Sequence, residues 1–111
     1  MKYRTVIFYR EYFEEFYNTQ TDDVKRKITW TLRLIENIWK IPETYLKHIE
    51  GTDGLYEIRV QFGSETLRIF CFFDTGQLVV VLSGFHKKTS KTPKNEIRKA
   101  LFLRHQYEKE K

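Results

Sequence analysis

Residues 54–85, with the sequence GLYEIRVQFGSETLRIFCFFDTGQLVVVLSGF, decide the fold that we expect for this chain. Three runs within this stretch, 55–62, 66–73 and 78–85, are rich in β-branched and aromatic residues, a composition typical of β-strands. The turn-forming residues Gly63-Ser64 and Asp74-Thr75-Gly76 separate the runs. The stretch therefore predicts three antiparallel strands joined as a meander.

Before this stretch, the sequence predicts one strand and then two helices. Residues 3–9, YRTVIFY, have the composition of a strand. In residues 11–18 the aromatic side chains recur at helical spacing. From residue 21 to about residue 40, apolar side chains recur every three or four positions, until Pro42 ends the pattern. These two consecutive helices would form an αα-hairpin with one hydrophobic face.

The remaining segments connect or end these elements. We expect residues 41–53 to be irregular, with one helical turn at 43–49. After the meander, Thr92-Pro93 is a typical start of a helix, because proline is tolerated at the first helical position. Ile97 and Ala100 then begin the apolar spacing of a C-terminal helix.

The expected order of elements, β-α-α-β-β-β-α, predicts an α+β fold class. In this fold a small antiparallel sheet, made of the N-terminal strand and the three-strand meander, is packed by the N-terminal αα-hairpin, with a C-terminal helix. We expect the helices to lie on one side of the sheet. A chain of 111 residues is long enough for one hydrophobic core, so residues 1–111 are expected to form a single domain.

Positive charge is concentrated in residues 86–99. The whole chain has 20 Lys and Arg residues and 15 Asp and Glu residues, a formal net charge of +5. Residues 86–99 contain six of the basic residues and one acid, Glu96, which is also a net charge of +5. A charge excess at the end of a buried strand is typical of a phosphate-binding segment. The plainer alternative is a solvated loop followed by a helix start.

Arg59 and Arg68 fall on neighbouring predicted strands. Because successive side chains of a strand point to opposite faces, both arginines can lie with Glu57 on one open face of the sheet. The basic segment leaves the adjacent strand and could approach the same face. Guanidinium groups fixed there would bind phosphate oxygens. The alternative is that they are surface arginines paired with Glu57 or Glu65.

Most aromatic side chains are expected to fill the core. We assign six of them to it: Phe8, Phe13, Phe16, Trp39, Phe62 and Phe73. Three others are candidates to flank the basic face, where a base could stack on them: Phe70, Phe72 and Phe85.

The sequence also argues against several classes of protein. Cys71 is the only cysteine, so an intramolecular disulfide is impossible, which suits a reducing cytoplasm. The apolar runs are too short to span a bilayer, and residues 1–4 do not begin a recognisable signal peptide. We therefore expect a cytoplasmic protein without membrane contact. No cluster of Cys and His has metal-ligand spacing, so we expect no metal.

Three segments of the chain resemble a known family. GLYEIRV (54–60), LRIFCFFD (67–74) and GFHKKTSKTP (84–93) are similar to the RelE/HigB-like toxins of type II toxin–antitoxin modules, in particular to the phage-derived HigB-like branch. The resemblance covers nearly the whole chain, because the order of elements and the length also fit. Its most specific part is GF-x-KKT-x-KTP with GLYEIR upstream.

The resemblance implies a ribosome-dependent mRNA endoribonuclease, an mRNA interferase, that blocks translation. Such enzymes use no metal and no cofactor: the ribose 2′-OH attacks the adjacent phosphate. The partners implied are the ribosome, its mRNA and a cognate antitoxin, a small helix-turn-helix protein encoded beside the toxin.

The resemblance also implies candidate site residues. The catalytic candidates are Arg59, Arg68, Lys87 and Lys88, and we add His86 because an imidazole titrates near neutral pH. Many relatives place a tyrosine or a His-Tyr pair where this chain has Phe85-His86, so the acid and base stay open. Contacts with RNA or the ribosome are expected from six further residues: Lys47, His48, Glu57, Lys91, Lys94 and Arg98.

Two other functions fit the same expected fold. One is a ParE-like toxin that inhibits DNA gyrase, and the other is a non-catalytic relative that binds only RNA or an antitoxin. Fold alone does not separate these functions. The constellation of Arg59, Arg68, Lys87 and Lys88 favours the nuclease, because gyrase inhibition does not need phosphate-binding groups clustered over a sheet.

Overall fold

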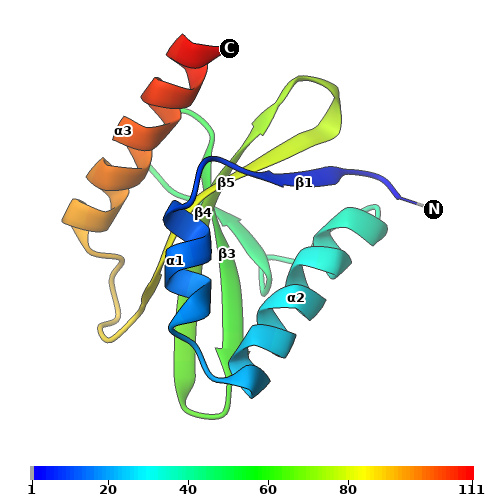
Figure 1. The fold of residues 1–111 in the computed structure, drawn as a ribbon, viewed down its shortest axis with the longest axis vertical. Helices are drawn as coiled ribbons and strands as arrows, with labels where there is room; N and C mark the ends of the chain where they lie inside the picture. The colour runs from blue at the N-terminus through cyan, green and yellow to red at the C-terminus, as the bar shows by residue number, and fades with distance from the viewer. Residues whose placement is uncertain (1) are drawn as a thin grey trace.

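The computed structural model describes residues 2–111, which form one five-stranded sheet with helices on both faces (Figure 1). The order of strands is β1-β5-β4-β3-β2. The predicted meander is confirmed, since β3 (Leu55–Phe62), β4 (Glu65–Asp74) and β5 (Leu78–His86) are consecutive antiparallel neighbours. A single 3-10 turn, η1 (Thr75–Gln77), joins β4 to β5.

The first strand, β1 (Thr5–Phe8), is present as predicted, but it pairs with β5 in parallel. The expected wholly antiparallel sheet is therefore corrected at this edge. A parallel neighbour needs a long crossover rather than a hairpin. Residues 9–77, which contain two helices and most of the meander, supply that crossover.

The other edge of the sheet is a short strand, so the helical turn expected over 43–49 is confirmed only at its start. The backbone amides of Tyr45 and Leu46 do bond to the carbonyl of Pro42, at 2.9 and 3.2 Å, which makes one turn. The chain then continues as β2 (Leu46–His48), antiparallel to β3. Pairing with the open edge of β3 satisfies the backbone there and buries the Leu46 side chain.

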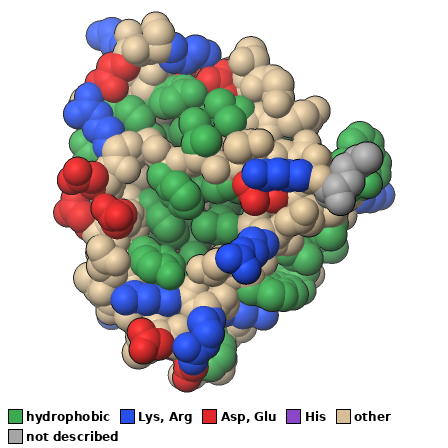
Figure 2. Space-filling model, turned by 45° about the vertical axis from the view of Figure 1, so that its right-hand side comes forward, with side chains coloured by type: hydrophobic (Ala, Val, Ile, Leu, Met, Phe, Trp, Pro, Cys, Tyr) green, Lys and Arg blue, Asp and Glu red, His purple; other side chains and the backbone are tan. Residues whose placement is uncertain are grey.

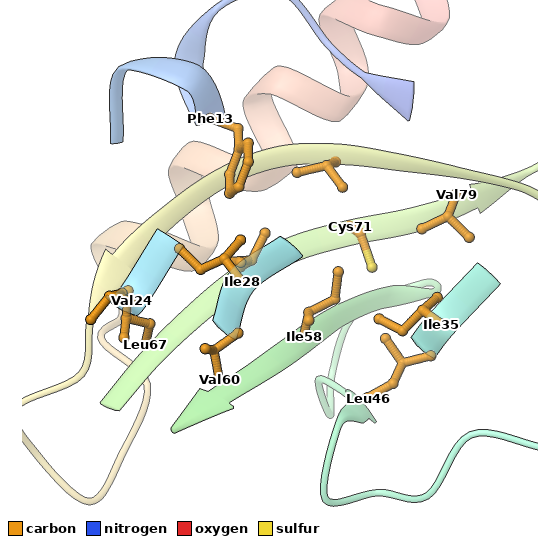
Figure 3. Packing of buried hydrophobic residues seen from close by; sticks show 12 residues of the cluster. Phe13, Val24, Ile28, Ile35, Leu46, Ile58, Val60, Leu67, Cys71 and Val79 are labelled. Carbon is orange, nitrogen blue, oxygen red and sulfur yellow. The ribbon is translucent and has the colours of Figure 1, made fainter. Parts of the chain in front are cut away.

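The predicted αα-hairpin is formed by α1 (Tyr12–Asn18) and α2 (Asp22–Asn37), and it covers one face of the sheet. Figure 3 shows the core on this face, where Phe13 and Ile28 point toward the strands. Cys71 is buried in this core, and burial raises the pKa of its thiol. No helix within residues 2–111 is long and apolar enough to cross a bilayer.

The C-terminal helix, α3 (Lys94–Glu110), packs on the opposite face, so the expectation that the helices share one side is wrong. Leu103 of α3 contacts a second core that contains Phe70, Phe72 and Leu82. Strands β4 and β5 carry apolar side chains on both faces. The second face therefore needs its own cover, and the apolar stripe of α3 provides it.

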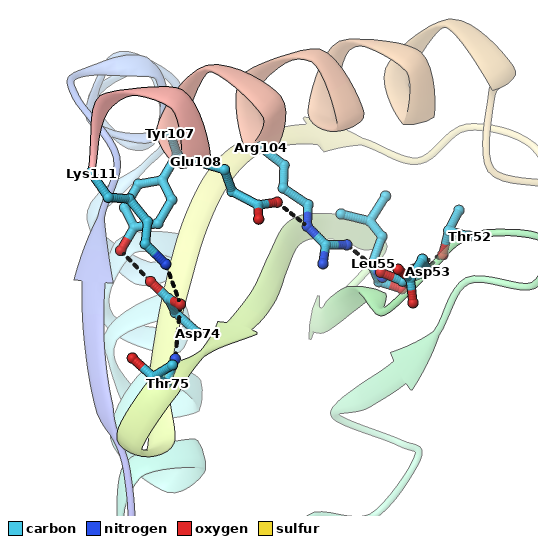
Figure 4. A network of polar contacts seen from close by, with 9 residues as sticks. All are labelled: Thr52, Asp53, Leu55, Asp74, Thr75, Arg104, Tyr107, Glu108 and Lys111. Carbon is cyan, nitrogen blue, oxygen red and sulfur yellow. Dashed lines mark hydrogen bonds and ion pairs between the residues drawn. The ribbon is translucent and has the colours of Figure 1, made fainter.

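Polar contacts fasten the C-terminal end of α3 to the sheet and its loops (Figure 4). The carboxylate of Asp74, at the end of β4, accepts hydrogen bonds from Tyr107 at 2.7 Å and from Lys111 at 2.9 Å. These bonds, that from Tyr107 first, lower the pKa of Asp74 to about 2. Arg104 also donates a hydrogen bond to the carbonyl of Asp53. The far end of α3, at Lys94, follows the basic loop.

Several aromatic side chains lie elsewhere than predicted. Phe8, Trp39 and Phe62 were assigned to the core, but they are 49%, 70% and 42% exposed. Phe8 is on an edge strand and Phe62 is at a hairpin, where no further element covers them. The three candidates for base stacking are instead buried in the core under α3: Phe70, Phe72 and Phe85.

Gly84 in β5 is required by the packing of α1 on the sheet. A Cβ atom at this position would lie 2.6 Å from Cδ2 of Phe16, which is closer than side-chain contacts allow. The glycine of the GF-x-KKT segment thus lets the Phe16 ring rest directly on the strand backbone.

We predict that Gly84→Ala lowers the free energy of unfolding by about 1–3 kcal/mol, because the added methyl overpacks this contact. In a Phe16→Ala background the same change should cost much less. Urea denaturation of the two single variants and the double variant measures this coupling. An equal cost of Gly84→Ala in both backgrounds would show that the Phe16 contact is not the reason for the glycine.

Candidate functional site

A buried carboxylate, Glu57, occupies the centre of the candidate site. It lies in the middle of β3, where strand alternation turns it toward the face that α3 partly covers, and its residue is only 3% exposed. Its Oε1 atom lies 3.4 Å from Nε of Arg59 and 3.6 Å from Nε of Arg68. A charge is costly to bury unless cations accompany it, so the two guanidinium groups compensate this carboxylate.

Arg59 and Arg68 are brought together, as the sequence predicted. They are register partners on β3 and β4, so their side chains project from the same face. Both Nε atoms are buried, and neither has a hydrogen-bond partner among residues 2–111. Burial, followed by repulsion from Arg59, lowers the pKa of Arg68, although Glu57 opposes this shift. One terminal nitrogen of each guanidinium donates to a backbone carbonyl, Arg59 to Glu43 at 3.4 Å and Arg68 to Leu67 at 3.1 Å. Poorly hydrated arginines held in this way are well suited to bind an anion through their remaining N–H groups.

Two lysines complete the cluster. The backbone amide of Lys87 donates to the carbonyl of Thr66 at 2.8 Å, which extends the pairing of β5 with β4 by one residue. Burial is the main cause of the lowered pKa of Lys87, and Arg68, Arg59 and Lys47 lower it further. Lys47 lies opposite Glu57 in the pairing of β2 with β3. We call this set of four cations around one carboxylate the cation cluster: Lys47, Glu57, Arg59, Arg68 and Lys87.

Thr92 belongs to the same site, although the sequence did not indicate it. Its hydroxyl donates a hydrogen bond to Oε2 of Glu57 at 3.0 Å. The sequence suggested a helix start at Thr92-Pro93, but α3 begins at Lys94 with Pro93 in the capping position and no side-chain cap. The only available signal was that a buried Glu57 needs a hydrogen-bond donor, and many hydroxyl groups could have met that need.

The structure does not bring the two candidate histidines to the cation cluster. His86 lies on the face of α1, with its ring 5.7 Å from that of Phe16 and its Nδ1 3.7 Å from the carboxylate of Glu65. His48 lies on the same side, where its ring contacts Tyr56 edge to face at 5.3 Å. Neither imidazole is next to Arg59 or Arg68.

The remaining basic candidates are exposed cations that follow Lys87 along the chain. Lys88 and Lys91 lie in the loop between β5 and α3, and Lys94 and Arg98 lie in the first turns of α3. All four are exposed, and within residues 2–111 none of them forms an ion pair. They are free to attract polyanions toward the cluster.

The opposite face of the sheet has a groove of about 420 Å³ between β1, α1 and α2. Its floor is apolar and includes Val6, Phe8 and Leu32, whereas Arg10 and Glu36 are among its charged residues. Figure 2 shows hydrophobic side chains gathered on one face of the molecule within a ring of charged ones. None of the predicted site residues lines this groove. In the part of the chain that the structure describes, no three His, Cys, Asp or Glu side chains are placed to share a metal ion.

The structure thus combines a five-stranded α+β fold with a cationic site whose side chains project from one face of the sheet. The chain belongs to the family described as Phage derived protein Gp49-like (DUF891), whose model matches residues 15–104. This family lies in the RelE/HigB-like superfamily of toxins from toxin–antitoxin modules, which confirms the resemblance at that level. Membership indicates a toxin and, with it, an antitoxin partner. No curated protein matches the chain.

The cation cluster predicts that the protein loses stability when the charge of Glu57 is removed. Glu57→Gln keeps the shape and an acceptor for Thr92, but it leaves four cations without their carboxylate. We expect the free energy of unfolding to fall by about 1–3 kcal/mol at low ionic strength. Added sulfate should recover most of this loss by occupying the site.

Urea denaturation with and without sulfate measures this effect. The matched control is Glu65→Gln, which removes an exposed carboxylate and should change stability by less than about 0.5 kcal/mol. If Glu57→Gln were as stable as the wild type at low ionic strength, the carboxylate would not be compensating the cluster.

Proposed function

We propose that this protein is a ribosome-dependent mRNA endoribonuclease, the toxin of a type II toxin–antitoxin module, and that it inhibits translation in the cytoplasm. The observation that carries the proposal is the cation cluster, in which two partly buried arginines with unpaired N–H groups lie beside Lys87 on a rigid sheet. Such a cluster suits the phosphate of an RNA backbone. The antitoxin that neutralises it would be a small helix-turn-helix protein.

The proposed reaction needs neither metal nor cofactor. The 2′-oxygen of a ribose loses its proton and bonds to the adjacent phosphorus, while the bond from phosphorus to the 5′-oxygen breaks. The 5′-oxygen takes up a proton, which leaves a 2′,3′-cyclic phosphate and a 5′-OH end. Negative charge grows on the phosphoryl oxygens during this step. In our proposal Arg59 and Arg68 stabilise that charge, and Glu57, 3.4 and 3.6 Å from their Nε atoms, orients them.

Lys87 is our candidate for the proton donor to the 5′-oxygen. It lies near both arginines, and its lowered pKa makes it a better acid than an ordinary lysine. Of the two other candidates for the base, Lys88 and His86, the geometry favours Lys88. Lys88 lies in the loop directly after Lys87, whereas His86 lies on the other face of the sheet. The exposed cations Lys91, Lys94 and Arg98, together with Lys47, would bind phosphates of mRNA or ribosomal RNA.

Expression of the protein without its antitoxin tests the proposal. We expect growth to stop, with incorporation of methionine lost before incorporation of thymidine. The mRNA recovered from ribosomes should carry new 5′-OH ends. Early loss of thymidine incorporation with normal protein synthesis would favour a gyrase-inhibiting toxin and contradict our proposal. Loss of translation without new 5′-OH ends would indicate binding without cleavage.

A sharper prediction separates the residues that act in the chemical step from those that bind RNA or the ribosome. Arg68 is fixed on a strand, so Arg68→Ala should raise the barrier by about 2–4 kcal/mol, which is about 10²–10³-fold in rate. Arg68→Lys keeps the charge but loses the planar donor pair, so it should not restore the rate. Lys91→Ala should mainly weaken ribosome binding, and more at higher salt.

Single-turnover cleavage at saturating ribosomes, beside a binding assay across a salt series, separates these effects. If Arg68→Ala cleaved at the wild-type rate at saturating ribosomes and Lys91→Ala cleaved slowly, our assignment would be wrong. The residues of the chemical step would then belong to the loop and not to the sheet.

A further inference from the structure

We propose that Thr92 is a positioning residue of this site. Through its hydrogen bond to Glu57, its hydroxyl holds the basic loop on the sheet and keeps Arg59 and Arg68 available for a phosphate. The consequence for cleavage rests on the proposed function, whereas the consequence for the loop and for phosphate binding does not.

The first argument concerns how the basic loop, residues 87–93, is held. At its start, the amide of Lys87 bonds to Thr66 of β4, and at its end the carbonyl of Pro93 accepts from the first turn of α3. Between these points, the hydroxyl of Thr89 bonds to the carbonyl of Lys91 at 2.8 Å, within the loop itself. Among residues 2–111, the bond from Thr92 to Glu57 is the one side-chain hydrogen bond that joins this loop to the sheet.

The second argument concerns what Glu57 would do without this bond. Its Oε1 lies 3.4 and 3.6 Å from the two arginine Nε atoms, and neither contact is a hydrogen bond. Among the described residues, Thr92 is therefore the only hydrogen-bond donor to this buried carboxylate. A buried carboxylate without a donor is costly, so Glu57 would close the short gap to one of the arginines.

That movement of Glu57 would weaken the binding of a phosphate by the arginines. The Nε atoms that face Glu57 are buried, so a phosphate would bind the other nitrogens of each guanidinium. A guanidinium that turns to donate to Glu57 loses the orientation that these nitrogens need. By satisfying Oε2 of Glu57, Thr92 allows the carboxylate to neutralise the arginines electrostatically without turning either guanidinium. The same bond fixes the distance between the loop lysines and the arginines, since it joins the loop to β3.

The test compares three variants. Thr92→Val removes the hydroxyl with little change of volume, and Thr92→Ser restores a hydroxyl at the same place. The matched control is Thr89→Val, which removes the other threonine hydroxyl bond of the loop but does not touch Glu57. Denaturation curves establish that each variant is folded before the measurements are made.

Two measurements do not depend on nuclease activity. Limited digestion with trypsin reports cleavage after Lys88, and titration with inorganic phosphate reports anion affinity. We expect Thr92→Val to be cut several-fold faster and to bind phosphate about tenfold more weakly, whereas Thr92→Ser and Thr89→Val stay near the wild type in affinity. In single-turnover cleavage, Thr92→Val should be about tenfold slower at saturating ribosomes, with ribosome affinity changed less than about twofold.

Several outcomes would overturn the inference. Wild-type phosphate affinity and trypsin resistance in Thr92→Val would show that the hydroxyl positions nothing, and failure of Thr92→Ser to restore them would show that the hydroxyl is not the responsible group. If Thr92→Val does not fold, NMR couplings of the Thr92 methyl in the wild type decide, since averaged couplings would exclude a fixed bond to Glu57. If the wild type cuts no mRNA, the proposed function fails, but the trypsin and phosphate results still decide the role of Thr92.

Discussion

The two central strands, β4 and β5, are apolar on both faces, and the rest of the structure follows from this constraint. One face is closed by Phe13 of α1 together with the long helix α2. The other is closed by α3, which is tied at its C-terminal end to Asp74 and covers the Phe70 and Phe72 side chains. Beyond these two phenylalanines the same face becomes charged at Glu57 and Arg68. The cation cluster therefore borders a dry core on one side and water on the other.

This border explains the electrostatics of the site. Arginines at the edge of a core lose part of their hydration, yet they stay charged, so their attraction for an anion is stronger than on an open surface. One carboxylate, Glu57, cannot neutralise four cations, and the cluster keeps a positive excess. Folding tolerates this excess because Arg59 and Lys47 still reach solvent, and because the sheet fixes the backbone under each charge. The excess of positive charge lowers the free energy of unfolding, but it leaves cations that are already positioned to bind an anion.

Much of the fold and part of the candidate site could be predicted from the sequence, because strands and helices have different periodicities of apolar residues. Alternation along β3 and β4 placed Arg59 and Arg68 correctly on one face. Alternation does not hold along the whole of β5, because this strand has an irregularity. Phe70 pairs with Ser83 while Cys71 pairs with Val81, so an extra residue in β5 inverts the order of faces beyond it. That inversion brings Phe85 under α3, Gly84 under Phe16 and His86 to the face of α1. A glycine within a strand, such as Gly84, often marks a bulge, but the sequence does not show which residue is inserted.

The same bulge helps to separate chemistry from binding in the proposed enzyme. The bulge turns Phe85, the last buried side chain of β5, into the core under α3. There its ring stacks on that of Phe70 at a centroid distance of 5.5 Å, so packing holds β5 nearly to the start of the loop. Lys87 lies two residues beyond Phe85, and its backbone amide makes the last pairing of this segment with β4. Lys88 and Lys91, the next two cations, lie in the loop after β5, are exposed and form no ion pair within residues 2–111. Transition-state stabilisation needs groups held within a fraction of an ångström, whereas long-range attraction of RNA does not. In the proposed enzyme, Arg68 on its strand would therefore serve the chemical step, Lys91 in the loop would serve binding, and Lys87 stands between them.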